Sequence, residues 1–491
     1  MPLCFDTTFF IKGKFVLRQL FYLAFWSILL FISPITAAKP TAGEVVGATC
    51  IVRVDDKLVL VHEILTRKLS LPGGLVEPNE DPAIAAQRET WEETGLVVSI
   101  KKELGRAENT VYYDCVSDSD IVSFQFNNLY NGYELPMWFA PHYGVEISSA
   151  MLVNPSNIPL ADYRFPEQTK WIEGLVAQAS NQPIKQVASL VKAAPDFNQV
   201  ELNWILQFQY VISELPEEIK NIVRPLILSG NLLAEPFLFV LLFPLLYVGY
   251  GKGFVTKVLF ATLTTALLSF VAQQGFALPH PHVYLPTLKL VETYGFALPS
   301  TSAALWITIG VLVIKREKSQ HVHTLSLALI GCLAWLSMAK FYTGSAFLLD
   351  IVSGVLLGFL TAWHVIRLEN KPNLNVEELL SSRGVWVVLL MICGAIGFVW
   401  PSLTLGYWFT LVLATLVLFL PWQGGTAMTK FPVAIYVVLV LLALNLSISY
   451  LATFVIHSSI LSLAVELIRY PVLVALFVTL LRRKPVSVTV P

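Results

Sequence analysis

Short apolar runs alternate with polar turns in the first part of the chain, between 43 and 181. The runs at 45–54, 57–65 and 121–130 are rich in β-branched and aromatic residues. Such runs predict β-strands, because branched side chains suit an extended, half-buried backbone. This pattern indicates the sheet of a mixed α/β domain.

Two segments of the same region have the pattern of helices, at 81–96 and 165–179. In the first, the acidic Asp81 precedes Pro82, and Gly95 closes the segment. Proline suits the first turn of a helix, and glycine suits the residue that ends one. We therefore expect an α/β domain in which helices pack on the sheet.

The pattern changes from residue 232 onward, where apolar runs become long enough to cross a bilayer. They predict an all-α bundle of about nine membrane spans, in two blocks at 232–368 and 384–484. The expected spans lie near 233–250, 254–272, 299–314, 322–339, 345–366, 385–400, 403–421, 432–455 and 459–481. The polar, amphipathic segment 182–231 is expected to be a connector that lies near the membrane surface.

The N-terminal segment 1–38 resembles an export signal. Lys12, Lys14 and Arg18 precede an apolar run at 20–37, and small residues follow it. This order is typical of a signal peptide, although the run is longer than usual, so an uncleaved anchor is the alternative. In both cases the next segment of the chain crosses the membrane.

Composition supports a membrane protein and excludes two other classes. Hydrophobic residues make up 55% of the chain and charged residues 14%, with a mean hydropathy of +0.65. Soluble proteins carry roughly 25% charged residues, so an ordinary cytosolic enzyme is excluded, as is a disordered chain. The net charge of -1 gives no sign of a nucleic-acid partner.

Charge is unevenly distributed, and this predicts an orientation. Segment 39–224 holds 15 basic and 25 acidic residues, whereas segment 231–491 holds 15 basic and 8 acidic residues. Twelve basic residues fall in alternate loops of the bundle, against only Lys289 and Lys340 on the other side. Basic loops stay in the cytoplasm. We expect a multi-pass protein of a bacterial inner membrane, with the α/β domain outside and the C-terminus in the cytoplasm.

Five cysteines are scattered along the chain and form no metal-binding pair. Cys50 and Cys115 are the two that lie in the α/β segment. They could form a disulfide in an exported domain, or could be two separate buried thiols.

Residues 72–96 hold the groups most able to perform chemistry. Glu89, Glu92 and Glu93 are spaced so that they share one helix face, which we expect to be accessible to solvent. Three adjacent carboxylates repel each other unless a divalent cation binds, and oxygen ligands suit Mg²⁺ or Mn²⁺. The alternative is a solvated acidic face without a function.

Other residues of this segment frame the carboxylates. Gly73 and Gly74 let the backbone approach them closely, because glycine has no side chain. Arg88 can pair with Glu80 and hold the preceding loop against the helix.

The same segment resembles the Nudix box, and Thr90 is a mild departure that affects only packing. The resemblance covers about 140 residues, at 43–181. It implies a Nudix fold and attack of water on a diphosphate, in which metal ions clamp phosphate oxygens. By this resemblance Glu89, Glu92 and Glu93 are metal ligands, one of them also a candidate base, and the Gly73 carbonyl is a further ligand. Arg88 and Glu80 orient the site, and Gly74 and Gly95 shape its backbone.

Segment 232–368 contains three spaced motifs, QQGFALPHPHVYLP, YGFALPSTSAA and AKFYTGSAFLLDIVSG. In order and spacing they resemble the motifs of type 2 phosphatidic acid phosphatases (PAP2), with catalytic groups missing. Ala346 stands where that family has a nucleophilic histidine, and Ser302 replaces a second histidine, so no phosphoenzyme can form. The residues at its phosphate-binding or catalytic positions are Gln273, His280, Ser300, Ser302, Lys340 and Asp350. They imply a degenerate lipid-phosphate site, and the alternative is a domain that serves only as an anchor.

Together these features predict a membrane-bound, Mg²⁺-dependent hydrolase of a diphosphate bond. The preferred substrate is a lipid diphosphate or a nucleotide-diphosphate lipid at the outer face of the bilayer. One alternative is a soluble nucleoside-diphosphate derivative, with the bundle as an anchor. Another is a lipid phosphatase or polyprenyl-diphosphate phosphatase that acts through the membrane domain. A non-enzymatic scaffold would have no use for the clustered carboxylates.

Overall fold

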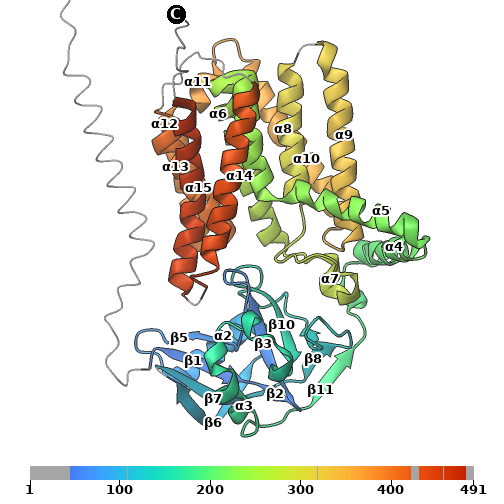
Figure 1. Ribbon diagram of the computed structural model, residues 1–491, viewed down its shortest axis with the longest axis vertical. Coiled ribbons are helices and arrows are strands. Elements are labelled where there is room, and N and C mark those ends of the chain that lie inside the picture. Colours follow the sequence, from blue (N-terminus) through green and yellow to red (C-terminus); the bar gives the residue numbers. More distant parts are fainter. Residues whose placement is uncertain (1–44, 108, 318, 422–430, 457, 483–491) are drawn as a thin grey trace, which may run out of the picture.

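The computed structural model describes residues 45–107, 109–317, 319–421, 431–456 and 458–482. The expected signal segment 1–38 lies outside these residues. An α/β domain lies at one end of the molecule, and a bundle of helices forms the remainder (Figure 1). The fold therefore has the two parts that the hydrophobic pattern predicted.

The α/β domain is built on two main sheets. The first has the order β5-β1-β7-β6, in which β1 runs parallel to β7 and antiparallel to β5, so the sheet is mixed. The second has the order β2-β3-β10-β9, with β4 paired to β3. The strands are β1 (Gly47–Ile51), β2 (Arg53–Val54), β3 (Lys57–Glu63), β4 (Leu69–Ser70), β5 (Gly73–Leu75), β6 (Val98–Ala107), β7 (Thr110–Ser117), β8 (Ile121–Phe124), β9 (Tyr133–Leu135) and β10 (Ile147–Val153).

Helices pack on the sheets through small and branched side chains. Helix α2 (Pro82–Thr94) buries Ala85 and Ala86 in the cluster that contains Ala48 of β1. Helix α3 (Thr169–Val176) buries Ile172 and Leu175 in a second cluster, with residues of β1 and β3. These two cores fix the position of α2, which carries the acidic residues.

Cys50 and Cys115 are joined by a disulfide between the neighbouring strands β1 and β7. Both residues are fully buried in the core of the α/β domain. Of the two alternatives that the sequence left open, the structure has the disulfide.

The segment expected as a connector begins with a strand. β11 (Ile184–Val187) pairs in parallel with β8, so the α/β domain extends past residue 181. Two helices follow, α4 (Asp196–Ser213) and α5 (Glu217–Ser229), beside the end of the bundle that faces the α/β domain (Figure 1). The Glu201 carboxylate of α4 accepts a hydrogen bond from the Leu348 backbone at 2.5 Å, so α4 is packed against the bundle.

The bundle contains apolar helices of several lengths. Within the described ranges, five are long and apolar enough to cross a membrane: Pro236–Phe276, His321–Tyr342, Leu348–Glu369, Phe431–Ala452 and Ser459–Leu480. Its helices are α6 (Pro236–Phe276), α8 (Thr301–Arg316), α9 (Ser319–Tyr342), α10 (Leu348–Glu369), α11 (Val376–Leu380), α12 (Arg383–Val399), α13 (Leu403–Ala414), continued by a π-helix at Thr415–Phe419, α14 (Phe431–Ala452) and α15 (Ser459–Arg482).

Helix α6 consists of two helices that double back at Gly251, whose φ of 81° is not helical. Trp306 of α8 donates a hydrogen bond to the Leu233 carbonyl, just before α6, and Gln273, near the end of α6, donates to the Pro299 carbonyl. Both ends of α6 therefore lie near the start of α8. This hairpin agrees with the two separate segments predicted at 233–250 and 254–272.

The bundle has two chemically different ends. Lys257 pairs with Glu369 and Glu377 at the end away from the α/β domain, where Arg316 also contacts Glu377. At the other end, the segment 277–300, which we name the interdomain loop, contains the short helix α7 (Pro281–Tyr284). It contacts the α/β domain (Figure 1).

Candidate active site

The boundaries of α2 are set by the residues that the sequence analysis named. The Asp81 side chain caps the helix by accepting a hydrogen bond from the Ala83 amide at 2.8 Å, and Pro82 occupies the first turn. Gly95 ends the helix in a left-handed conformation at φ 73°, and its amide donates to the Trp91 carbonyl. Glycine is favoured there, and a Cβ at Gly95 would also lie 2.4 Å from the Phe139 ring.

Arg88 organises the acidic face of α2. Its guanidinium binds Glu80 through two hydrogen bonds, Nε to Oε1 at 2.9 Å and Nη2 to Oε2 at 3.0 Å. Its Nη1 also lies 2.8 Å from Glu89 Oε1 and 3.0 Å from Glu92 Oε2. The pairing with Glu80 confirms the sequence-based expectation, and the hydrogen bond from Arg88 is the main cause that lowers the pKa of Glu80.

The two glycines before α2 are required by close packing. A Cβ on Gly74 would lie 2.4 Å from the carboxyl carbon of Glu89, and one on Gly73 would lie 2.5 Å from the Ala48 carbonyl oxygen. Both distances are below any normal contact between heavy atoms. The strand that carries the glycines therefore lies directly against the carboxylates.

Glu93 differs from the other two glutamates. It is 7% exposed, so the expectation that all three share an accessible face is wrong for Glu93. Its Oε2 accepts a hydrogen bond from the Gly73 amide at 3.0 Å, which places the side chain beneath the glycine strand. Burial raises the pKa of Glu93 well above its usual range.

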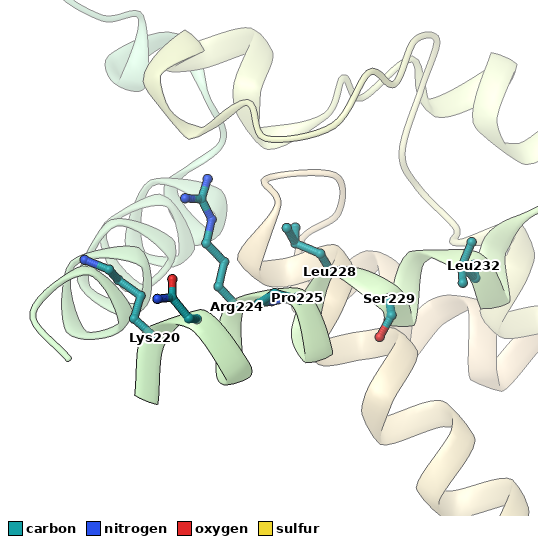
Figure 2. Close-up of a pocket in the computed structure, with 7 residues that line it drawn as sticks. Lys220, Arg224, Pro225, Leu228, Ser229 and Leu232 are labelled. Carbon is teal, nitrogen blue, oxygen red and sulfur yellow. The ribbon is translucent and has the colours of Figure 1, made fainter. Parts of the chain in front are cut away.

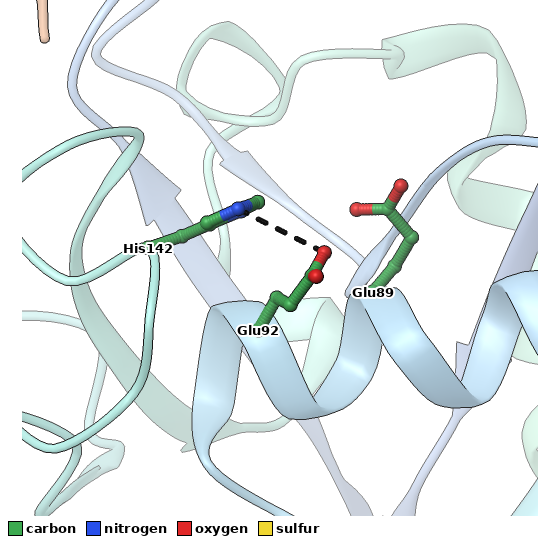
Figure 3. Close-up of side chains that lie close together, drawn as sticks. All are labelled: Glu89, Glu92 and His142. Atoms are coloured by element: carbon green, nitrogen blue, oxygen red, sulfur yellow. Dashed lines mark ion pairs between the residues drawn. The ribbon is translucent and has the colours of Figure 1, made fainter. Parts of the chain in front are cut away.

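His142 joins the site from a loop that the sequence analysis did not identify. Its Nε2 lies 3.8 Å from Glu92 Oε2, and its backbone amide donates to the Glu92 carbonyl at 2.8 Å (Figure 3). The Glu146 carboxylate, 3.4 Å from Nδ1, raises the pKa of His142. The sequence held no signal for this histidine, because it lies some 50 residues from Glu92 and outside the box.

Glu89, Glu92 and His142 form a set of donors that could hold a divalent cation. One ligand atom from each residue lies within 4.8 Å of the others, and all three side chains are half-buried. The two carboxylates suit Mg²⁺ or Mn²⁺, whereas the imidazole is more typical of transition-metal sites. The donor set therefore fits a divalent ion, although Glu93 is turned toward Gly73.

The residues that the sequence analysis assigned to a degenerate lipid-phosphate site lie at the bundle end that faces the α/β domain. Ser300 and Ser302 Oγ atoms are 3.5 Å apart, and the Ser300 amide donates to the Asp350 carbonyl. The Asp350 carboxylate caps its own helix by accepting from the Phe347 amide at 2.8 Å. The Gln273 side-chain amide donates a hydrogen bond to the Pro299 carbonyl.

His280 and Lys340 complete this group. His280 Nδ1 lies 2.6 Å from the Ser345 carbonyl, and burial together with the nearby Lys340 ammonium lowers the pKa of His280 to about 4. The structure thus brings these six residues to one end of the bundle. The side chains of Gln273, His280 and Asp350 already form hydrogen bonds with backbone groups.

A separate pocket of about 610 Å³ lies along α5 (Figure 2). Lys220, Arg224, Leu228 and Leu232 are among the residues that line it. None of its lining residues belongs to α2 or to the His142 loop, so the pocket is not the carboxylate site.

Comparisons with known proteins concern the α/β domain. Residues 43–173 match the NUDIX domain family. The chain is 36% identical over 84 residues to a MutT-like protein from Streptomyces ambofaciens, covering 17% of this chain and 54% of that protein. It is 33% identical over 119 residues to an RNA pyrophosphohydrolase from Bartonella tribocorum, covering 24% of this chain and 64% of that protein. The match thus spans less than two thirds of either relative.

Among solved structures, an ADP-ribose pyrophosphatase from Streptococcus suis aligns with 18% identity and a TM-score of 0.20, covering 28% of this chain and 96% of that one. The family match, the two sheets around α2 and the Glu80–Arg88 frame of its acidic face all concern the same segment. Residues 43–173 therefore form a Nudix domain.

Proposed function

We propose that this protein is a membrane-bound hydrolase that cleaves a diphosphate bond at its Nudix site with Mg²⁺ or Mn²⁺. The cluster of Glu89, Glu92 and His142 beside the Arg88–Glu80 pair carries the proposal. Arg88 supplies only one positive charge to Glu80, Glu89 and Glu92, and a divalent cation would neutralise the remaining negative charge.

Glu89, Glu92 and His142 would hold the metal, with the Gly73 carbonyl as a further ligand. When bound, the ion neutralises phosphate oxygens and lowers the pKa of the attacking water. Arg88 keeps the loop that carries Glu80 in place and orients Glu89 and Glu92. Glu93 accepts a hydrogen bond from the Gly73 amide and so holds the glycine strand against the carboxylates.

A lipid-linked diphosphate is the proposed substrate class. The Cys50–Cys115 disulfide supports an oxidising compartment outside the cytoplasm. The basic residues Lys257 and Arg316 lie at the bundle end away from the Nudix domain, as the positive-inside rule requires for an external Nudix site. Diphosphates at that surface are carried by lipids, while free nucleotides are scarce there.

Helices α4 and α5 support contact with the bilayer. Ile219, Ile222 and Leu226 form a stripe along α5 and are 48%, 70% and 56% exposed. Trp335 of the apolar helix α9 donates a hydrogen bond to the Leu226 carbonyl, so this stripe continues the apolar surface of the bundle. Amphipathic helices of this kind lie in the membrane interface.

The membrane domain is proposed to hold the phosphate of the lipid through Lys340, His280 and Ser300. The alternative, a bundle that only anchors the Nudix domain, is supported by the use of Asp350 as a helix cap. A soluble nucleoside-diphosphate derivative is the second candidate substrate, because one relative is named an RNA pyrophosphohydrolase.

A substrate screen tests the function. Full-length protein in nanodiscs with Mg²⁺ is given a polyprenyl diphosphate, a nucleotide-diphosphate lipid and a soluble nucleotide sugar, and released phosphate or nucleotide is measured. We expect hydrolysis of a lipid substrate, and a loss of ~100-fold or more in Glu92→Gln. The matched control is Glu173→Gln, which changes an exposed glutamate of α3.

Two results would contradict the proposal. Hydrolysis of the nucleotide sugar alone would assign the bundle the role of an anchor. Equal turnover in Glu92→Gln and the control would place the chemistry outside the Nudix domain.

A further inference from the structure

The loop that carries His142 is packed directly against the membrane domain. The Tyr143 and Phe296 rings are edge to face, with centroids 5.8 Å apart, and Tyr143 is buried. A Cβ on Gly144 would lie 2.5 Å from Gly295 Cα, so the two backbones are in contact. The residues directly after His142 are therefore in contact with the interdomain loop.

The backbone of His142 also contacts helix α2. The His142 amide donates to the Glu92 carbonyl at 2.8 Å, and the Glu146 amide donates to the His142 carbonyl at 3.0 Å. His142 thus lies between the last turn of α2 and a turn supported by the membrane domain. A metal ligand held in this way depends on both supports, because ligand positions must be accurate to about 0.5 Å.

Further contacts hold the interdomain loop on the Nudix domain. Tyr284 packs on Trp138 with ring centroids 5.6 Å apart, and the Tyr284 carbonyl accepts from the amide of Leu190, in the segment after β11, at 2.9 Å. Lys289 Nζ lies 3.5 Å from Glu134 of β9, and both side chains are largely buried. Together with the Phe296–Tyr143 pair, these contacts hold the interdomain loop at several points along its length.

The same loop is tied to the bundle by two histidines. His280 Nδ1 lies 2.6 Å from the Ser345 carbonyl, and His282 Nδ1 lies 3.1 Å from the Gly344 carbonyl. The loop is therefore anchored on one side in the turn between α9 and α10 and on the other side in the Nudix domain. It forms a continuous packed connection between the two domains.

We propose that the interdomain loop is a positioning element for His142, so that the Nudix metal site is complete only when the membrane domain is docked. The proposal rests on the proposed Nudix chemistry for its purpose, but it concerns metal binding, which can be measured without any substrate. Phe296 and Gly295 act through Tyr143 and Gly144, and they contact neither metal nor substrate themselves.

Mn²⁺ affinity of the full-length protein, followed by electron paramagnetic resonance, tests the proposal. Phe296→Ala removes the ring that supports Tyr143, and we expect Mn²⁺ affinity to fall about tenfold, as for other residues that orient a ligand. Phe296→Leu keeps an apolar side chain and should restore most of the affinity. The matched control Tyr294→Ala truncates a 46% exposed aromatic ring of the same loop and should bind Mn²⁺ like the wild type.

A double-mutant cycle with His142→Ala separates positioning from a general effect on folding. In the His142→Ala background, Phe296→Ala should cause no further loss of Mn²⁺ affinity, because the ligand it positions is absent. The proposal is overturned if Phe296→Ala binds Mn²⁺ normally, or if its loss is equally large in the His142→Ala background. Normal Mn²⁺ binding and coupling with no hydrolysis of any diphosphate would instead contradict the proposed function alone.

Discussion

Arg88 binds Glu80 in a two-pronged arrangement, with hydrogen bonds of 2.9 and 3.0 Å from Nε and Nη2. The planar guanidinium can make both bonds at once, and a lysine ammonium cannot. The pair therefore holds the loop before α2 in place, and the positive charge of Arg88 neutralises the charge of Glu80.

Arg88→Lys should lower kcat/KM about tenfold, because lysine keeps the positive charge but cannot make both hydrogen bonds to Glu80. Arg106→Lys is the matched control, because Arg106 makes the same two-pronged contact with Glu103 on an exposed strand. The measurement is kcat/KM of both variants and the wild type, by steady-state kinetics on the substrate found in the screen. Similar losses in both variants would show that the Arg88 geometry has no special role.

Gly74→Ala should weaken metal binding. Its Cβ would lie 2.4 Å from the Glu89 carboxyl carbon, so Glu89 would have to move away. We expect Mn²⁺ affinity to fall at least about tenfold. Gly174→Ala in α3 is the control, because its Cβ meets nothing within 4 Å and alanine favours a helix by about 1 kcal/mol. A Gly74→Ala protein with unchanged Mn²⁺ affinity would exclude Glu89 as a ligand.

Acid should destabilise the anchoring of the interdomain loop. Burial, with the charges of Lys340 and Lys289 nearby, lowers the pKa of His280 to about 4 and that of His282 to about 3, from 6.5. A base with a lowered folded-state pKa takes up protons on unfolding, so stability is complete above pH 6.5 and falls as pH drops toward 4.

Each histidine contributes up to about 2 kcal/mol to this loss at pH 5. Thermal unfolding of the full-length protein between pH 7.5 and 5 measures it. His282→Asn keeps a donor for the Gly344 carbonyl but does not titrate, and it should flatten the dependence on pH. An unchanged slope in His280→Asn/His282→Asn would assign the acid sensitivity to other groups.

Topology can be tested by cysteine labelling in a background without Cys4, Cys332 and Cys393. Leu129→Cys, at a 98% exposed position of the Nudix domain, should react with a membrane-impermeant maleimide in intact cells. Lys371→Cys, after α10, should react only once the membrane is opened, because basic loops stay inside. The reverse result would move the Nudix site to the cytoplasm and favour soluble nucleotides.

The sequence predicted local features of the site well, because they depend on residues close together in the chain. Asp81 and Gly95 bound α2 as expected, and Arg88 reaches Glu80 across eight residues. The burial of Glu93 could not be predicted, since it depends on where the glycine strand β5 crosses the helix. His142 could not be predicted either, because only the packing of its loop on α2 brings it to Glu92.

In the bundle, hydropathy located the helical segments, including both halves of α6. It gave no sign that the interdomain loop packs on the Nudix core, since nothing in the sequence marks Val283 and Phe296 as neighbours of that core. It also missed β11, whose four residues pair with a distant strand.

The docking of the Nudix domain has a consequence for which substrates can react. A domain on a flexible tether would sample many heights above the bilayer. Here Trp138, Tyr143 and Glu134 contact the interdomain loop, so the distance from the carboxylates to the bundle is set by packed side chains. For the lipid diphosphate proposed as substrate, this fixed distance would favour lipids whose diphosphate projects from the membrane by the matching length.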